Sequence, residues 1–192
     1  MTDRITIYHN YSDEELLRLL QRSERAVFEE LYKRFGQKMY SYFYRMLWKD
    51  KALAEDFTQD IFIKLIQHAG SFIEGRQVAT WLYSIAHNMC KNEYRKQEVR
   101  KTHARVQLPK EPSSQMPNPD LKRFKEAVHQ CTQELPEEKK TLYILRFQEN
   151  LSVPEISSIM KIPEGTIKSR IFYLLKEMKE KLKDFETLPI YP

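Results

Sequence analysis

The sequence LSVPEISSIMKIPEGTIKSRIFYLLKEMKEK at residues 151–181 decides the fold of the C-terminal part of the chain. Ser152, followed three residues later by Glu155, forms a capping box that predicts the start of one helix. A short turn leads to a second helix, which opens with Pro-Glu-Gly-Thr at residues 163–166. Two helices joined by a tight turn are typical of the helix-turn-helix, whose second helix enters the major groove of DNA.

The second helix of this motif has an apolar face and a polar face. Its inward stripe is predicted from apolar residues at helical spacing, which are Ile167, Ile171, Leu174, Met178 and Leu182. Because only the N-terminal part of such a helix reaches base edges, we expect the DNA contacts at the start of the polar face. The expected contact residues are Glu164, Thr166, Lys168, Ser169, Arg170 and Tyr173. The alternative is a helical hairpin whose charged face is only solvated.

A second candidate nucleic-acid surface lies upstream, on a helix expected over residues 80–101. Polar residues recur on it every four positions, with Asn88 and Asn92 beside them and Trp81 on the apolar side; they are Tyr83, His87, Lys91 and Arg95. Aromatic rings stack on unpaired bases and cations follow phosphates, so the block favours binding to single-stranded nucleic acid. Trp81 also fits a core position, and the cations also fit a solvated surface.

The helix expected over residues 51–68 carries more apolar surface than one core needs. Its first apolar face consists of Ala54, Phe57, Ile61 and Leu65. A second face combines acids with apolar residues; it consists of Asp56, Gln59, Asp60 and Ile63. Such a helix either docks onto another protein or is buried on two sides within its own domain.

The remaining signals organise the chain into two small helical domains. Ser12 and Glu15 form a capping box after a loose tail, Gly36 is a possible helix break, and Asp50 is a candidate N-cap. Prolines between residues 105 and 120 predict a flexible linker. No alternating strand pattern occurs, so we expect an all-α fold. The predicted segments are an N-terminal tail with a first helix (1–22), a first domain (23–104), the linker (105–120) and a second domain (121–186).

Composition bounds the function classes. The 192 residues carry a formal net charge of +5, which is modest, so the placement of the cations has to indicate DNA binding. Two cysteines cannot make a disulfide framework, and no signal pattern or membrane-length apolar run occurs, so we expect a cytoplasmic protein with no membrane insertion. We expect no metal and no cofactor: His87 and Cys90 supply only two ligands, and no glycine-rich phosphate loop occurs.

Three segments together carry a resemblance to a known family. They are AEDFTQDIFIKL at 54–65, TWLYSIAHNMCKNEYRK at 80–96 and LPEEKKTLYILRFQENLSVPEISSIMKIPEGTIKSRI at 135–171. In this order and separation they resemble a sigma-70-family transcription initiation factor of the extracytoplasmic-function (ECF) group. The resemblance covers roughly residues 26–101, as region 2, and 121–183, as region 4.

The resemblance implies a sigma factor that binds core RNA polymerase and directs promoter-specific initiation, with no catalytic chemistry of its own. Region 2 would bind the β′ clamp helices through Asp56, Gln59, Asp60 and Ile63. The loop at 71–79 would pocket a flipped base of the −10 element. The set implied for −10 DNA is Phe72, Arg76, Trp81, Tyr83, His87, Asn88, Lys91 and Arg95. Region 4 would read the −35 element and touch the β flap, and an anti-sigma factor is an implied partner.

The chain departs from the family pattern at two places. Met160-Lys161 stands where the family commonly has Leu-Gly, so Lys161 must adopt a turn conformation that glycine takes more easily. Ile171-Phe172-Tyr173 replaces an Arg/Ala-rich stretch, which alters base preference at −35 or provides a protein contact. The competing functions are a stand-alone helix-turn-helix regulator, which binds duplex DNA without polymerase, and a DNA-processing enzyme, for which no clustered catalytic groups are visible.

Overall fold

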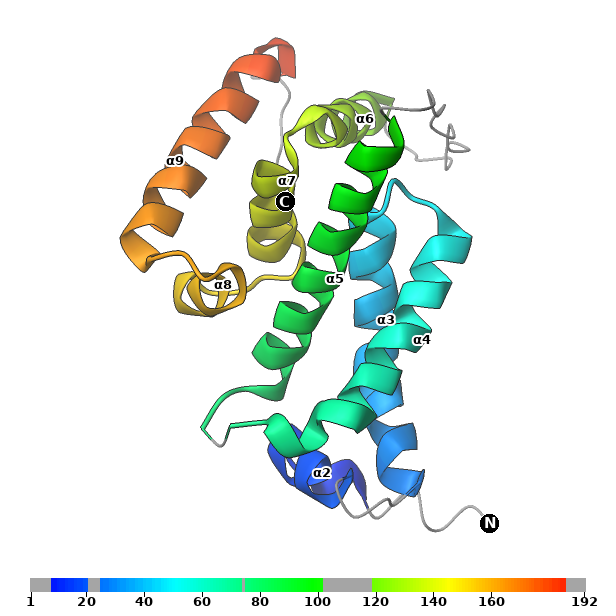
Figure 1. Cartoon of the computed structure of the whole chain (residues 1–192). Coiled ribbons are helices and arrows are strands. Elements are labelled where there is room, and N and C mark those ends of the chain that lie inside the picture. The colour runs from blue at the N-terminus through cyan, green and yellow to red at the C-terminus, as the bar shows by residue number, and fades with distance from the viewer. Residues whose placement is uncertain (1–7, 21–24, 74, 102–118, 186–192) are drawn as a thin grey trace. The chain divides into compact units, whose positions relative to one another are not determined.

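The computed structural model describes residues 8–20, 25–73, 75–101 and 119–185, and within these ranges it contains helices and no strand (Figure 1). The prediction of an all-α fold is confirmed. The chain divides into two compact units, the first mainly from residues before 110 and the second mainly from those after. The predicted linker lies outside the described residues except for its last two positions.

The first unit is a bundle of helices closed at one end by a short helix. Its elements are η1 (Tyr8–Asn10), α2 (Asp13–Leu20), α3 (Arg25–Met46), α4 (Lys51–His68), η2 (Ala69–Ser71) and α5 (Val78–Lys101). Helices α3, α4 and α5 pack against one another. Helix α2 packs against α3, η2 and α5 (Figure 1).

The core of the first unit is formed by the apolar stripes that the helical spacing predicts. Every helix contributes fully buried side chains to it, among them Leu16, Leu17, Leu31, Met39, Phe43, Ile61, Leu65, Leu82 and Ala86. Burying one large apolar side chain contributes about 1.5–3 kcal/mol. The packing of the unit therefore depends on all four helices, α2 included.

Two helix ends predicted in this unit have different outcomes. Asp50 caps α4 by accepting from the backbone N–H of Leu53 at 3.0 Å, as predicted. The break predicted at Gly36 is wrong, because α3 runs through it without interruption. A Cβ at Gly36 would lie 3.3 Å from the ring of Tyr32, so glycine makes room for this ring and does not end the helix.

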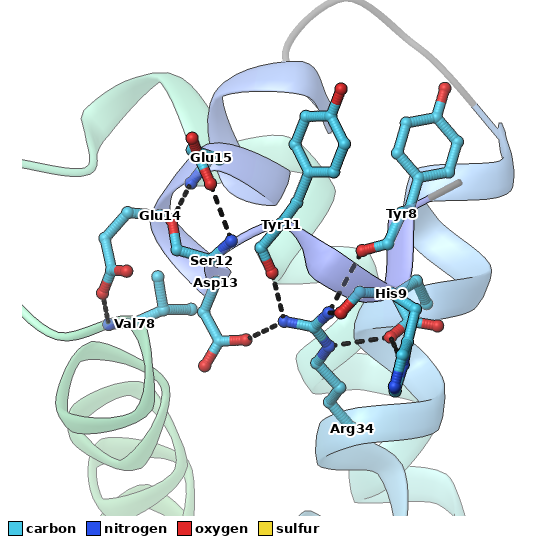
Figure 2. Close-up of polar contacts among 10 residues, drawn as sticks. Tyr8, His9, Tyr11, Ser12, Asp13, Glu14, Glu15, Arg34 and Val78 are labelled. Atoms are coloured by element: carbon cyan, nitrogen blue, oxygen red, sulfur yellow. Dashed lines mark hydrogen bonds and ion pairs between the residues drawn. The ribbon is translucent and has the colours of Figure 1, made fainter. Parts of the chain in front are cut away.

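The N-terminal part is held more firmly than the sequence indicates. Ser12 and Glu15 make the predicted capping box, with Glu15 Oε2 accepting from the Ser12 N–H at 2.7 Å. The residues just before Ser12, expected to be a loose tail, include the 3-10 turn η1, whose backbone carbonyls accept from Arg34 of α3 (Figure 2). Residues 1–7 of that tail lie outside the described residues.

The second unit contains the helix-turn-helix. Its elements are α6 (Pro119–Glu134), α7 (Glu137–Tyr143), the π-helical turn η3 (Ile144–Gln148), α8 (Val153–Met160), α9 (Glu164–Lys181) and η4 (Lys183–Phe185). Helices α6 and α7 pack against α9. Its buried side chains include Cys131, Leu142, Leu145, Ile156, Ile159, Ile167 and Leu174.

The turn between α8 and α9 forms without glycine. The predicted capping box is present: Ser152 accepts from the Glu155 N–H, and Glu155 accepts from the Ser152 N–H at 2.8 Å. Lys161 has φ 57° and ψ 44°, the left-handed conformation expected of it. Ser157 then fixes the turn by donating from Oγ to the Ile162 carbonyl at 2.6 Å. The path of the chain from α8 into α9 is thereby set by local hydrogen bonds.

Candidate nucleic-acid and protein interfaces

The polar face of α9 lies where the sequence predicts it. Glu164, Lys168, Ser169 and Tyr173 are exposed, and Thr166 and Arg170 are half-buried. On the opposite side Ile167, Leu174 and Met178 are buried, whereas Ile171 and Leu182 are only half-buried. The first two turns of α9 therefore present charged and hydroxyl groups on a helix anchored by its apolar side. This is the arrangement that a major-groove reader requires.

Arg170 is held by an acid from another helix. Its guanidinium donates to Glu138, which lies in the first turn of α7. Both side chains remain partly exposed, at 40% for Arg170 and 60% for Glu138, so water screens the pair and it contributes little to stability. The pair ties the Arg170 guanidinium to the first turn of α7. A separation of 32 residues gives no sequence signal for this contact.

Further ion pairs tie α9 to the helices beneath it. Lys139 Nζ lies 2.5 Å from Glu177 Oε2, and this hydrogen bond lowers the pKa of Glu177 below its usual value. Lys181 lies 3.6 Å from Glu134 of α6, and also 4.0 Å from Glu177 of its own helix. These pairs lie on the later turns of α9, whereas the residues predicted to contact DNA begin on its first turn.

An apolar patch interrupts the polar face of α9 after Arg170. Phe172, Tyr173 and Leu175 are 64%, 65% and 45% exposed. The rings of Phe172 and Tyr173 lie 5.4 Å apart in an edge-to-face arrangement. Large apolar side chains exposed together mark contact surfaces more often than solvated ones. The patch coincides with the stretch where the sequence departs from the family pattern.

Helix α4 presents the outward face predicted for it. Asp56, Gln59 and Asp60 are exposed, and Ile63 and Ile66 are each 51% exposed. The alternative that both apolar faces are buried within the domain is therefore wrong for the isoleucines in the described structure. Phe62, beside them, is buried at ring distances of 5.9 Å from Phe28 and 4.8 Å from Tyr32. The result is a mixed acidic and apolar surface suited to a protein partner.

The segment between η2 and α5 gathers aromatic and basic side chains. The rings of Phe72 and Trp81 lie 5.5 Å apart, edge to face, and both residues are half-buried. Arg76 is exposed after Gly75, whose φ of +86° turns the chain. An aromatic pair beside a cation at the start of a helix can receive an unstacked base and its phosphate.

The polar stripe predicted along α5 needs one correction. Asn88, Lys91 and Arg95 are exposed and His87 is half-buried, but the prediction that Tyr83 lies on this surface is wrong. Tyr83 is 4% exposed, with its ring 5.4 Å from that of Tyr42. A spacing of four residues drifts by about 40° per step around a helix of 3.6 residues per turn, so the stripe rotates into the bundle by Tyr83.

Within the described residues, no group of three or more His, Cys, Asp or Glu side chains is placed to hold a metal ion. His87 and Cys90, the pair considered from the sequence, share α5, and the Cys90 side chain is buried. Among the helices of the described residues, none is both long and apolar enough to cross a membrane.

These features define a DNA-binding protein of the helix-turn-helix class with a further helical unit, and comparisons with known proteins identify its family. Residues 31–100 match the family profile Sigma-70 region 2, and residues 125–178 match Sigma-70, region 4. The RNA polymerase sigma-H factor of Pseudomonas aeruginosa is 30% identical over 181 residues, which cover 83% of this chain and 88% of that protein. The ECF RNA polymerase sigma-E factor of Haemophilus influenzae is 30% identical over 189 residues, covering 90% and 96%.

A solved structure has the same fold. It is described as the sigma factor RpoE in complex with the anti-sigma factor NepR from Bartonella quintana. Its TM-score is 0.67 at 22% sequence identity, and the match covers 81% of this chain and 96% of the other. The chain belongs to the sigma-70 family of RNA polymerase sigma factors, in the ECF group. As a sigma factor it binds core RNA polymerase and directs promoter-specific transcription initiation.

Proposed function

We propose that α9 reads the −35 element of the promoter. The observation that carries this proposal is the exposed polar start of α9, above a buried apolar stripe, in a helix-turn-helix whose turn is held by hydrogen bonds. Lys168 and Arg170 contact phosphates or guanine, Thr166 and Ser169 donate to phosphates, and Glu164 accepts from cytosine. Tyr173 extends the contact along the groove, beside the exposed Phe172.

In this proposal the first unit reads and opens the −10 element. Phe72, Arg76 and Trp81 receive a base that leaves the stack, supported by the contact between the two rings. The next turns of α5 follow the non-template strand through His87, Asn88, Lys91 and Arg95. Opening needs no chemical step, because tighter binding to single-stranded than to duplex DNA shifts the equilibrium toward the melted state. Tyr83 is left out of this set because it is buried.

The outward face of α4 is proposed as the contact with the polymerase β′ clamp helices. Asp56, Gln59, Asp60 and Ile63 form it, and their exposure leaves them accessible to a partner. Acids around a half-exposed isoleucine combine a buried apolar anchor with a polar rim once the partner is bound. The second unit touches the β flap, for which the apolar patch at Phe172 is the candidate surface.

The remaining assignments follow from the family. The proposed division is a tail with a first helix (1–22), region 2 (23–104), a flexible linker (105–120) and region 4 (121–186). The protein acts in the cytoplasm, has no catalytic activity of its own and needs no cofactor. An anti-sigma factor holds it inactive, by analogy with the Bartonella quintana relative, whose structure contains one.

The assignment of α9 is tested by replacing Arg170. We expect Arg170→Ala, assembled with core polymerase, to lose about 1–3 kcal/mol of discrimination between an intact and a substituted −35 element. Transcription from paired templates that differ only at −35 measures this loss. Arg123→Ala removes the same charge from an exposed position on α6 and should leave the discrimination unchanged. Unchanged −35 dependence of the Arg170 variant would remove that residue from the reading set.

A further inference from the structure

Arg34 of α3 fastens the N-terminal segment to the bundle (Figure 2). Its guanidinium donates to both backbone and side-chain acceptors, at distances of 2.7–3.2 Å. The acceptors are the carbonyls of Tyr8, His9 and Tyr11 and the carboxylates of Asp13 and Glu30. One side chain thus holds the turn η1 and the first residue of α2 at fixed positions on α3.

The contact sets one guanidinium against two carboxylates, and its groups are partly removed from water. Burial alone would lower the pKa of Arg34, but the hydrogen bonds of Asp13 and Glu30 outweigh it, and the net direction is upward. The Glu30 side chain is only 2% exposed, so Arg34 also neutralises a buried carboxylate. A guanidinium that fills several acceptors at once cannot be replaced by the point charge of lysine.

Helix α2, fixed in this way, reaches the start of α5. Glu14 Oε1 accepts from the backbone N–H of Val78, the first residue of α5, at 3.4 Å (Figure 2). The first N–H groups of a helix have no partner inside the helix, and a negative charge is favourable there. The contact is long for a hydrogen bond, and the favourable charge at the helix end adds to it.

The same short helix also lies against the other side of the proposed DNA-binding segment. Helix α2 packs against η2, which precedes Phe72, as well as against α5, which contains Trp81. Leu16 and Leu17 anchor α2 in the core with no exposed surface. Both the entrance and the exit of the segment with Phe72 and Arg76 therefore rest on α2. The ring contact between Phe72 and Trp81 joins the two sides.

We propose that α2 is a positioning element for promoter opening, with Glu14 placing the first turn of α5 and Arg34 holding α2 in register. The inference rests on the proposed role of Phe72 and Trp81 in −10 recognition. Neither Glu14 nor Arg34 touches DNA in this scheme. They set the geometry in which Trp81 meets a base, so their loss changes the opening step and leaves −35 recognition and polymerase binding as they are.

The experiment uses the full chain assembled with core polymerase and a promoter that carries a fluorescent base analogue in the −10 element. Glu14→Ala should lower the extent of opening by roughly twofold to tenfold, the size expected from one lost net hydrogen bond. It should also reduce the ratio of opening at the native −10 element to opening at a substituted one. Glu14→Gln keeps an oxygen acceptor for the Val78 N–H and should recover most of both properties.

Two controls separate positioning from general damage to α2. Glu15→Ala breaks the capping box of the same helix without touching α5, so it should open the promoter as the unaltered protein does. Arg34→Lys keeps the positive charge but cannot make all the hydrogen bonds of the guanidinium, so it should lower the extent of opening, as Glu14→Ala does. Polymerase affinity and −35 discrimination, measured for every variant, should stay constant.

The outcomes distinguish this inference from the proposed function. If Trp81→Ala abolishes −10 preference while Glu14→Ala opens the promoter normally, the role of α2 is overturned and the −10 assignment stands. Equal defects of the Glu14 and Glu15 alanine variants, or a parallel loss of polymerase affinity, also overturn it. If Trp81→Ala has no effect on −10 preference, the proposed reading site fails, and the positioning role fails with it.

Discussion

Lys161 adopts a strained backbone conformation that the turn between α8 and α9 requires. It ends α8 in the left-handed conformation, with φ 57° and ψ 44°, and its N–H donates to the Ser157 carbonyl. An L-residue in this conformation costs roughly 1–2 kcal/mol relative to the right-handed one. The hydrogen bond from Ser157 Oγ to the Ile162 carbonyl offsets part of that cost and keeps the turn closed.

Glycine at this position should therefore stabilise the protein. We expect Lys161→Gly to raise the free energy of unfolding by about 0.5–1 kcal/mol, because the left-handed strain disappears while glycine loses more entropy on folding. Urea denaturation of the full chain measures the change. Lys168→Gly, inside α9, should instead destabilise by about 1 kcal/mol. A Lys161→Gly protein less stable than the parent would contradict this account of the turn.

The pair of Arg170 with Glu138 leads to a second prediction at the residue scale. In the proposed DNA contact, Glu138 would compete with phosphate for the guanidinium, so Glu138→Gln should increase the affinity of the assembled polymerase for −35 DNA by roughly threefold, within the range of a surface ion pair. Fluorescence anisotropy with a −35 duplex measures it. Glu134→Gln, which alters the pair with Lys181 near the end of α9, should have no effect. Weaker binding by the Glu138 variant would mean that the acid orients Arg170 for DNA.

At the scale of elements, local chemistry is what the sequence predicts well. The caps at Ser12, Asp50 and Ser152 depend on residues three positions away, so a reader of the sequence can identify them. The prediction at Gly36 is wrong because the glycine makes room for the ring of Tyr32 within the helix, a packing contact that the sequence does not reveal. The left-handed turn at Trp48 and Lys49 also lacked a sequence signal, since neither residue type favours it.

The candidate sites divide in the same way. The exposed start of α9 and the outward face of α4 follow from helical periodicity, which the sequence contains. The burial of Tyr83 depends on which helix covers it, and the grip of Arg34 on the N-terminal segment joins residues 21 to 26 positions apart. Contacts of that kind depend on how helices pack, and periodicity alone does not determine packing.

An ion pair between α7 and α9 makes the stability of the second unit depend on pH. The hydrogen bond from Lys139 depresses the pKa of Glu177 below its usual value. A carboxyl with a depressed folded-state pKa stabilises fully above its unfolded pKa, and the stabilisation is lost as pH falls through the folded value. Glu177→Gln should therefore be less stable than the parent at about pH 7, and the two should converge as the pH falls through the lowered folded-state pKa of Glu177.

Denaturant unfolding of both proteins across this pH range, followed by circular dichroism, measures the convergence. Glu180→Gln on the same helix provides the matched control, because Glu180 is exposed and its replacement should leave the pH dependence unchanged. A constant difference between the Glu177 variant and the parent at every pH would show that packing, and not the charge of Glu177, accounts for its contribution.

At the scale of the whole molecule, two small helical units carry the two proposed promoter-reading surfaces. One carries the outward face of α4 and the aromatic pair near α5, and the other carries the helix-turn-helix. A formal net charge of +5 over 192 residues is modest for a protein that would grip duplex DNA unaided. We infer that tight binding to the promoter arises only when the polymerase carries both units. A stand-alone regulator would bind its duplex site without the polymerase.

The most direct measurement is run-off transcription with purified core polymerase on a library of genomic promoters, with and without the chain. The account predicts that transcripts appear only when both are present. They should start downstream of one shared pair of −35 and −10 elements, while the chain alone binds the same duplexes weakly. If the chain adds no transcript at any template, or binds a duplex site equally well without polymerase, the central claim is contradicted.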